Sequence, residues 1–135
     1  MQILAAILCD SASDYQGKLC ILGAFDTILA AKTPAVHPTC AIALRFLSKP
    51  GDEGAHQIRV SLIDPDGKDV LPSGGIKIDF TLPPAPETTF FTSHNVVLNL
   101  QGITLGAYAA YSFDVYFDGE LATRVPLQVV RPTAK

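Results

Sequence analysis

Charge is scarce in this sequence, and neither sign dominates. Charged residues make up 17% of the 135 residues, against roughly 25% in an average soluble domain. The 10 Lys and Arg residues face 13 Asp and Glu residues, so no strongly basic field is present to hold a phosphate backbone. The sequence also has no run of about 18 apolar residues. We therefore expect neither a nucleic-acid partner nor a membrane span.

Residues that commonly carry catalysis or bind metals are also few. The histidines and cysteines are His37, His56, His94, Cys9, Cys20 and Cys40. No Cys-x-x-Cys or His-x-x-x-His spacing prepares a zinc site. A nucleophilic pair of Cys40 with His37 is disfavoured, because the strand alternation turns Cys40 inward. The sequence therefore predicts no enzyme, no catalytic residue and no cofactor or metal.

The three cysteines are an odd number, and each lies within an apolar stretch. This pattern predicts free thiols in a reducing compartment, although a Cys9–Cys20 bridge is possible if their strands are neighbours. The apolar run Ile3–Cys9 has no preceding Lys or Arg and no small residue directly before Cys9. It fits a secretory signal poorly, so we expect a cytoplasmic protein that starts at Met1.

Glycine and proline are abundant, with 10 of each spread along the chain, which favours many short elements over long helices. Apolar residues alternate with polar or small ones in six segments, as one buried and one exposed strand face require. These segments are 39–46, 57–62, 76–82, 96–101, 111–117 and 121–129. The length fits one domain over residues 1–135. The sequence predicts an antiparallel β-sandwich of about seven to nine strands with immunoglobulin-like or related Greek-key topology.

Two segments, Gln2–Cys9 and Leu19–Ala31, are apolar at nearly every position. We interpret them as central strands covered on both sides, or as one strand bent across two sheets with Gly23 at the bend or at a bulge. A helix is the alternative for Gln2–Cys9, but its short length favours a strand. The polar residues 10–14 that follow are expected to form a loop.

The expected turns can be tested against the strand register. A two-residue loop at Asp118–Gly119 would set Phe113 opposite Arg124. A three-residue loop over 117–119 with a bulge at Gly119 instead pairs Val115 with Leu121 and restores matching faces.

Pro65–Asp66–Gly67 is expected to form a similar turn that sets Leu62 opposite Val70. We expect an exposed loop at 49–54, and crossovers between sheets at 33–38 and 82–87.

Small and aromatic residues point outward in two places. Ala41 and Ala43 lie on the outer side of the alternation, and tyrosines gather in 108–111 and at Tyr116. Flat, weakly polar surfaces rich in tyrosine are typical of interfaces, although ordinary packing within the domain explains these residues equally well.

Acidic residues offer a second possibility. Asp10 and Asp14 lie in one expected loop, and Asp64 and Asp66 lie in another. Such end loops can supply oxygen ligands to calcium, although turn formation alone explains Asp64 and Asp66. A ligand-binding module for carbohydrate or calcium is therefore the alternative function.

Several stretches together resemble a family of small bacterial proteins of unknown function. They are Leu8–Ala12, Gly17–Asp26, His37–Pro38, Ala43–Arg45 and Tyr111–Asp114. The resemblance covers nearly the whole chain and implies a bacterial, cytoplasmic, stand-alone domain, with no activity attached. Taken with the residue patterns, it leads us to expect a non-enzymatic domain that binds an unknown protein partner or its own copies as a homo-oligomer.

Overall fold

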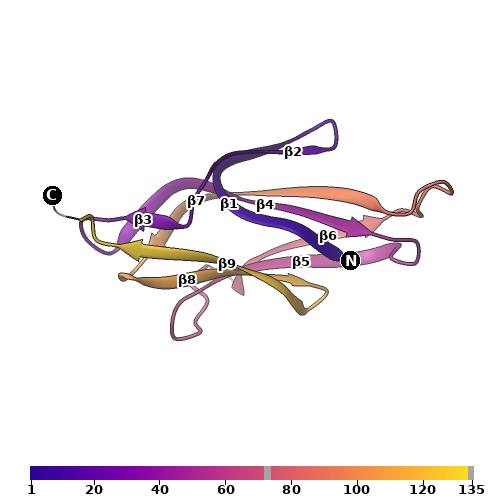
Figure 1. Cartoon of the computed structure of the whole chain (residues 1–135). Helices are drawn as coiled ribbons and strands as arrows, with labels where there is room; N and C mark the ends of the chain where they lie inside the picture. The colour runs from indigo at the N-terminus through magenta and orange to yellow at the C-terminus, as the bar shows by residue number, and fades with distance from the viewer. Residues whose placement is uncertain (72–73, 134–135) are drawn as a thin grey trace.

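Strands account for the regular structure of this protein in a computed structural model that describes residues 1–71 and 74–133 (Figure 1). The strands are β1 (Gln2–Tyr15), β2 (Lys18–Ala24), β3 (Thr27–Leu29), β4 (Ala35–Ser48), β5 (Gly54–Ile63), β6 (Ile76–Leu82), β7 (Thr92–Leu105), β8 (Ala109–Phe117) and β9 (Glu120–Val130). In these described ranges, no helix has the length and apolar character that crossing a membrane requires. The predicted all-β class is confirmed.

The strands form two sheets that pack face to face. Sheet A has the order β2-β1-β4-β7, and sheet B has the order β3-β9-β8-β5-β6. Neighbouring strands are antiparallel, except that β3 runs parallel to β9. The prediction of two sheets with about seven to nine strands is confirmed, whereas the parallel pair was not expected.

The core lies between the sheets, where the predicted alternation places it. Its largest fully buried side chains include Phe46, Leu44, Phe113 and Leu62. Phe46 sits at the centre of an aromatic group, with ring centroids 5.2 Å from Phe117 and 5.9 Å from another ring on β6. Most inward residues of β6 and those of the first half of β7 are only half-buried, because both strands lie at sheet edges.

The turn between β8 and β9 differs from the prediction. Phe117 pairs directly with Glu120, and both loop residues are left-handed, with φ of 49° at Asp118 and 83° at Gly119. This is the two-residue loop that matches the twist of a hairpin. The carboxylate of Asp118 accepts a hydrogen bond from the backbone N–H of Gln57 at 2.8 Å. The expected three-residue loop is therefore wrong.

A bulge within β9 instead places the apolar residues of β8 and β9 on the same side of the sheet. Val115 pairs with Thr123, but the next residue pairs with Leu121, so Ala122 is the extra residue. The predicted pair of Val115 with Leu121 is wrong. The bulge turns Leu121 outward to 44% exposure, while β9 residues beyond it rejoin the core.

The N-terminal half of the chain contains both a confirmation and two corrections. Gln2–Cys9 is a strand, as predicted, but β1 continues to Tyr15 through residues 10–14, which were expected to form a loop. The segment 19–31 does bend across two sheets, since β2 belongs to sheet A and β3 to sheet B. It is not a central strand covered on both sides, because β2 and β3 are edge strands.

Gly23 lies at this bend with a φ of 72°. A Cβ atom at this position would come within 2.5 Å of a carboxylate oxygen of Asp10. The left-handed backbone therefore favours glycine here, and any larger residue would also have to displace the exposed Asp10 side chain.

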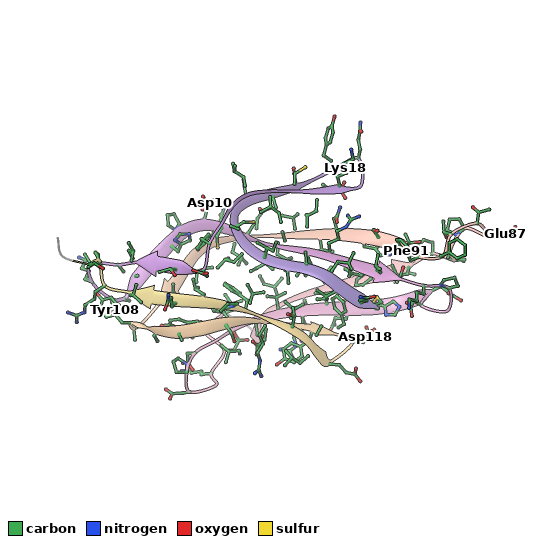
Figure 2. All side chains as sticks on the ribbon, in the orientation of Figure 1. Asp10, Lys18, Glu87, Phe91, Tyr108 and Asp118 are labelled. Carbon is green, nitrogen blue, oxygen red and sulfur yellow. The ribbon has the colours of Figure 1, made fainter. Side chains whose placement is uncertain are left out.

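The β1–β2 hairpin folds back over the outer face of sheet A (Figures 1 and 2), with Lys18 near its tip. Arg45 on β4 donates a hydrogen bond to the Gly17 carbonyl at 3.0 Å and another to the Asn95 side chain at 2.8 Å. Asn95 in turn donates to a carboxylate oxygen of Asp14 at 3.1 Å. These polar bonds fasten the hairpin tip to β4 and β7.

The remaining connections follow the predictions. Residues 82–87 lead from β6 in sheet B to β7 in sheet A, and 33–38 lead from β3 in sheet B into β4 in sheet A. The exposed loop at 49–54 follows β4. The Val70 N–H donates to the Leu62 carbonyl at 2.7 Å, which confirms the predicted pairing across the turn at 65–67.

Candidate functional site

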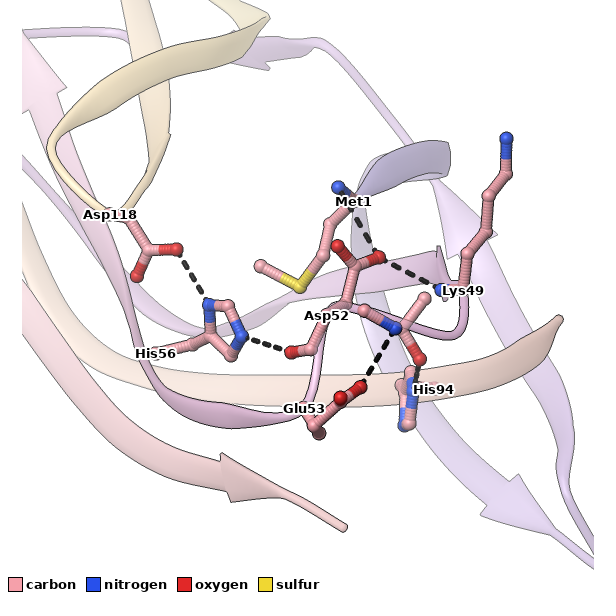
Figure 3. Close-up of polar contacts among 9 residues, drawn as sticks. Met1, Lys49, Asp52, Glu53, His56, His94 and Asp118 are labelled. Carbon is pink, nitrogen blue, oxygen red and sulfur yellow. Dashed lines mark hydrogen bonds and ion pairs between the residues drawn. The ribbon is translucent and has the colours of Figure 1, made fainter. Parts of the chain in front are cut away.

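A polar network joins the loops at one end of the sandwich (Figure 3). His56, at the start of β5, has Nδ1 2.7 Å from a carboxylate oxygen of Asp118 and Nε2 2.5 Å from the carbonyl oxygen of Asp52. Both partners are acceptors, so the geometry fits a ring that donates from both nitrogens, which is the imidazolium form. The hydrogen bond to Asp118 raises the pKa of His56, and the same bond lowers the pKa of Asp118.

This network ties several segments of the chain together. An imidazolium has no free lone pair with which to take a proton. The carboxylate of Asp52 lies 3.8 Å from the amino group of Met1 and accepts the backbone N–H of Lys49 at 2.8 Å. His56 therefore links β5 to the loop after β4 and to the β8–β9 turn, and the carboxylate of Asp52 adds the N-terminus.

His94 forms the second polar pair. Its Nε2 lies 2.7 Å from the hydroxyl of Ser48, which is buried. The ring stacks on Phe46 with centroids 5.0 Å apart, and burial lowers the pKa of His94. A nucleophilic serine needs a base that a third group orients, and within the described ranges His94 bonds to no carboxylate. The pair therefore lacks the orienting member of a triad.

His37 and Cys40 do not form a dyad. Within the described residues, Nε2 of His37 is buried without a hydrogen-bond partner, and the ring lies against Phe25 with centroids 5.4 Å apart. Burial raises the pKa of Cys40 to about 11, so this thiol stays protonated at neutral pH.

The cysteines are all free, as predicted. The strands of Cys9 and Cys20 are neighbours, but the register pairs Cys9 with Ala24 and Cys20 with Ser13, so no bridge forms. Cys9 is buried, and its thiol donates to a backbone carbonyl at 3.6 Å. Burial raises its pKa, which makes it a poor nucleophile.

The acidic residues expected in end loops do not gather. Asp10 and Asp14 lie on β1, and Asp64 accepts the backbone N–H groups of Asp66 and Lys68, each at 2.9 Å. The described part of the chain holds no group of three or more His, Cys, Asp or Glu residues suited to a metal ion. The alternative of a calcium or carbohydrate module stays an untested prediction.

The expected outward alanines are not a free surface. Ala41 and Ala43 are 0% exposed and pack in a small second core with Cys9. Ala12, Ile21 and other residues of the folded-back hairpin cover them. Of the two interpretations of these alanines, packing within the domain is the one that the structure supports, because this chain's own hairpin lies over them.

The tyrosines are also used within the fold. The hydroxyl of Tyr108 donates to the Ala30 carbonyl at 2.9 Å, and that of Tyr111 donates to the Ala107 carbonyl at 3.0 Å. The guanidinium of Arg59 lies 3.9 Å above the ring of Tyr116. Each ring therefore has a packing role, as the alternative interpretation held.

Within residues 1–71 and 74–133, one edge of β7 has no neighbouring strand in sheet A. β7 has 14 residues and pairs only with β4. Among the described residues, no backbone hydrogen bond reaches β7 from outside its own sheet. β7 contains no charged residue, and the whole segment 88–113 contains none either. This segment was not predicted as a site, although its missing charge is readable from the sequence.

The other edge strands are short or protected. β3 has 3 residues, and β6 has 7 residues with Lys77 and Asp79 exposed on it. β2 is drawn back over sheet A by the bonds at the hairpin tip. Short length, charge and bending are the usual means of preventing edge-to-edge pairing. β7 is long and uncharged, and its one irregularity is at Gly102, where φ is 63°.

A groove with both apolar and polar walls runs along the second half of this edge. It has a volume of about 340 Å³ and lies between residues 99–104 of β7 and the side chains of Val70, Leu71 and Ile76. Leu100 forms part of its wall. A side chain from an added strand would therefore find a partly apolar surface here.

Two exposed aromatic residues lie at the other end of the same edge. Phe90 is 89% exposed and Phe91 is 54% exposed, and they directly precede Thr92, the first residue of β7. Figure 2 shows Phe91 at the end of the sandwich opposite Tyr108. Large contiguous patches of exposed apolar residues are typical of interaction surfaces, and these two aromatic side chains are adjacent in the chain.

Comparisons with known proteins give one match. A family model described as "Family of unknown function (DUF6941)" matches residues 4–130. This confirms the predicted resemblance to a family of unknown function over nearly the whole chain. No curated protein and no solved structure matches.

Proposed function

We propose that this chain, which belongs to the family of unknown function DUF6941, is a non-enzymatic domain that binds another protein chain through the open edge of β7. The observation that carries the proposal is a 14-residue edge strand without a single charged residue. Strand addition to such an edge recruits the partner through backbone hydrogen bonds.

The physical argument rests on unpaired backbone groups. Each residue at a sheet edge presents N–H and C=O groups in alternation, and these are a template for another strand. A lysine or proline on the edge would discourage such pairing, yet 92–105 contains neither. The groove beside residues 99–104 adds a place for alternate side chains of the incoming strand.

A binding role without catalysis is supported by the state of the polar groups. His56 donates from both ring nitrogens, and Ser48–His94 has no orienting carboxylate among the described residues. The thiols of Cys9 and Cys40 are buried, and burial raises their pKa values, so both stay protonated. Of these groups only His94 keeps a free lone pair beside a pocket, and no carboxylate among the described residues orients it.

The proposal includes an immunoglobulin-like topology and a bacterial, cytoplasmic location. The order β1-β4-β7 facing β9-β8-β5-β6 corresponds to strands A-B-E facing G-F-C-C′ of such sandwiches, which supports this topology. The three free thiols support a reducing compartment.

Site-specific photocrosslinking in cells tests the proposed function. A photoreactive benzoylphenylalanine replaces Gln101, an exposed residue on β7, and in a matched control replaces Thr81, an exposed residue on the β6 edge. We expect a covalent adduct with a defined protein chain from position 101 and none from position 81. An absence of adducts from position 101, or equal adducts from both positions, would contradict a role for this edge.

A further inference from the structure

We infer that the strand paired with β7 is β7 of a second copy of this chain, added antiparallel across a twofold axis. This inference rests on the proposed function and specifies its partner. It joins two features of one edge, the exposed phenylalanines before β7 and the groove beside its second half, whose walls include Leu100 and Ile76.

Antiparallel pairing of a strand with its own copy sets the start of each strand beside the end of the other. Phe90 and Phe91 directly precede Thr92. In the register that pairs the full strand, with Thr92 opposite Leu105 of the second copy, they come to lie next to the end of the other β7. That is where the groove between 99–104, Val70 and Ile76 lies. Because a twofold contact occurs twice, both pairs of phenylalanines and both grooves are used.

Charge favours this partner as well. In an isologous pair each strand meets residues of its own sequence, and like charges directly opposite each other destabilise a sheet. No charged residue occurs in 88–113, so two copies of this edge meet without repulsion. The net charge of −3 per chain is also too small to oppose association strongly.

The pairing closes the molecule's longest open edge. It joins two four-stranded sheets through β7 and gives backbone groups of 92–105 a hydrogen-bond partner. It also covers Phe90, whose ring is otherwise 89% exposed. Aromatic side chains that enter an apolar pocket at an interface commonly contribute most of its binding energy.

Sedimentation equilibrium of the purified full chain tests this inference. We expect a monomer–dimer equilibrium for the wild type. The double variant Phe90→Ser/Phe91→Ser should weaken the dimer by about tenfold or more. The matched control Leu22→Ser removes a side chain that is 70% exposed on β2 and should leave the equilibrium unchanged. Far-ultraviolet circular dichroism and thermal melting establish that each variant is folded.

The outcomes separate this inference from the proposed function. A wild type that stays monomeric at the highest accessible concentration overturns the second copy as partner. A dimer that the phenylalanine substitutions do not weaken overturns it too. If the wild type is monomeric while position 101 crosslinks to a different protein in cells, the proposed function stands and this inference falls. If position 101 gives no adduct at all, the proposed function falls as well.

Discussion

β4 and β7 are neighbours in sheet A, yet the fold treats them differently. β4 is paired on both sides, by β1 and β7, and residues 41–44 on it are 0% exposed. β7 is paired on one side, and much of it is half-buried. The apolar residues 41–44 of β4 are buried by other parts of the same chain. Those along β7 remain partly available, which is why we assign binding to β7.

The two faces of β4 explain why its burial is so complete. Leu44 and Phe46 face the large core between the sheets, whereas Ala41 and Ala43 face the β1–β2 hairpin. A hairpin backbone can come close to a sheet only where the side chains between them are small. The alanines therefore serve packing within the chain, and the low charged fraction of the sequence partly reflects this second core.

Truncation on the inner face of β4 should have the largest effect. Leu44→Ala removes a fully buried side chain and should lower the free energy of unfolding by about 2–5 kcal/mol. Urea denaturation followed by circular dichroism measures this change. A loss well below 1 kcal/mol would mean that the inner face of β4 does not pack as described.

A larger side chain on the outer face of β4 should cause the second-largest loss of stability. Ala43→Leu forces extra volume under the hairpin and should destabilise the fold by about 1–3 kcal/mol. Ala110→Leu is the matched control, because Ala110 is exposed on β8 and should change stability by less than about 0.5 kcal/mol. Equal effects of the two substitutions in urea denaturation would place Ala43 outside a packed core.

The ion pair beyond the end of β4 should have a smaller effect that depends on pH. Because the folded state raises the pKa of His56, the stabilisation from this group is complete below its unfolded pKa of about 6.5 and is lost as pH rises through the folded value. Because it lowers the pKa of Asp118, the contribution of Asp118 is present above about pH 3.9 and is lost as pH falls.

Asp118→Asn should therefore destabilise the protein most between about pH 4.5 and 6. Asp118 is 47% exposed, so solvent screening limits the loss to about 1 kcal/mol or less. Asparagine keeps an acceptor for the backbone of Gln57 and tolerates the left-handed turn. Thermal melting from pH 4.5 to 9 measures the difference, and a loss that grows toward pH 9 would contradict an imidazolium at His56.

A charge on the edge of β7 should have the smallest effect on stability. Asn99 is exposed, so Asn99→Lys should change the free energy of unfolding by less than about 0.5 kcal/mol. It should nevertheless abolish association, because a lysine on an open edge opposes strand pairing and two copies would repel across the twofold axis. Thr81→Lys on β6 is the control, and light scattering after gel filtration should find its association unchanged. Loss of association in both variants would point to net charge, not to the β7 edge.

Much of the fold can be predicted from the sequence, because alternation reports which way side chains point. It correctly assigns the inward residues of β4, β5 and β8. Alternation does not report what lies beyond the outward face, so the hairpin over Ala41 and Ala43 was missed. Alternation also cannot locate a bulge. One extra residue brings the apolar faces of β8 and β9 onto the same side of the sheet whether it lies in the turn or at Ala122.

The candidate site was harder to predict for a related reason. Whether a strand lies at the centre or the edge of a sheet depends on the order of strands in space, which neighbouring residues do not encode. The pairing of His56 with Asp118 likewise joins residues that are 62 positions apart. The local signal that was available is the missing charge in 88–113 together with the adjacent pair Phe90–Phe91.

Amide hydrogen exchange along the two open edges tests the central claim most directly. Exchange read by mass spectrometry would compare peptides from β7 (Thr92–Leu105) and β6 (Ile76–Leu82) at low and high protein concentration, in the wild type and in Asn99→Lys. We predict that β7 amides become more protected as the wild-type concentration rises, and that Asn99→Lys removes this gain while β6 is unchanged. Association that leaves β7 exchange unaltered, or that protects β6 instead, would contradict pairing through the β7 edge.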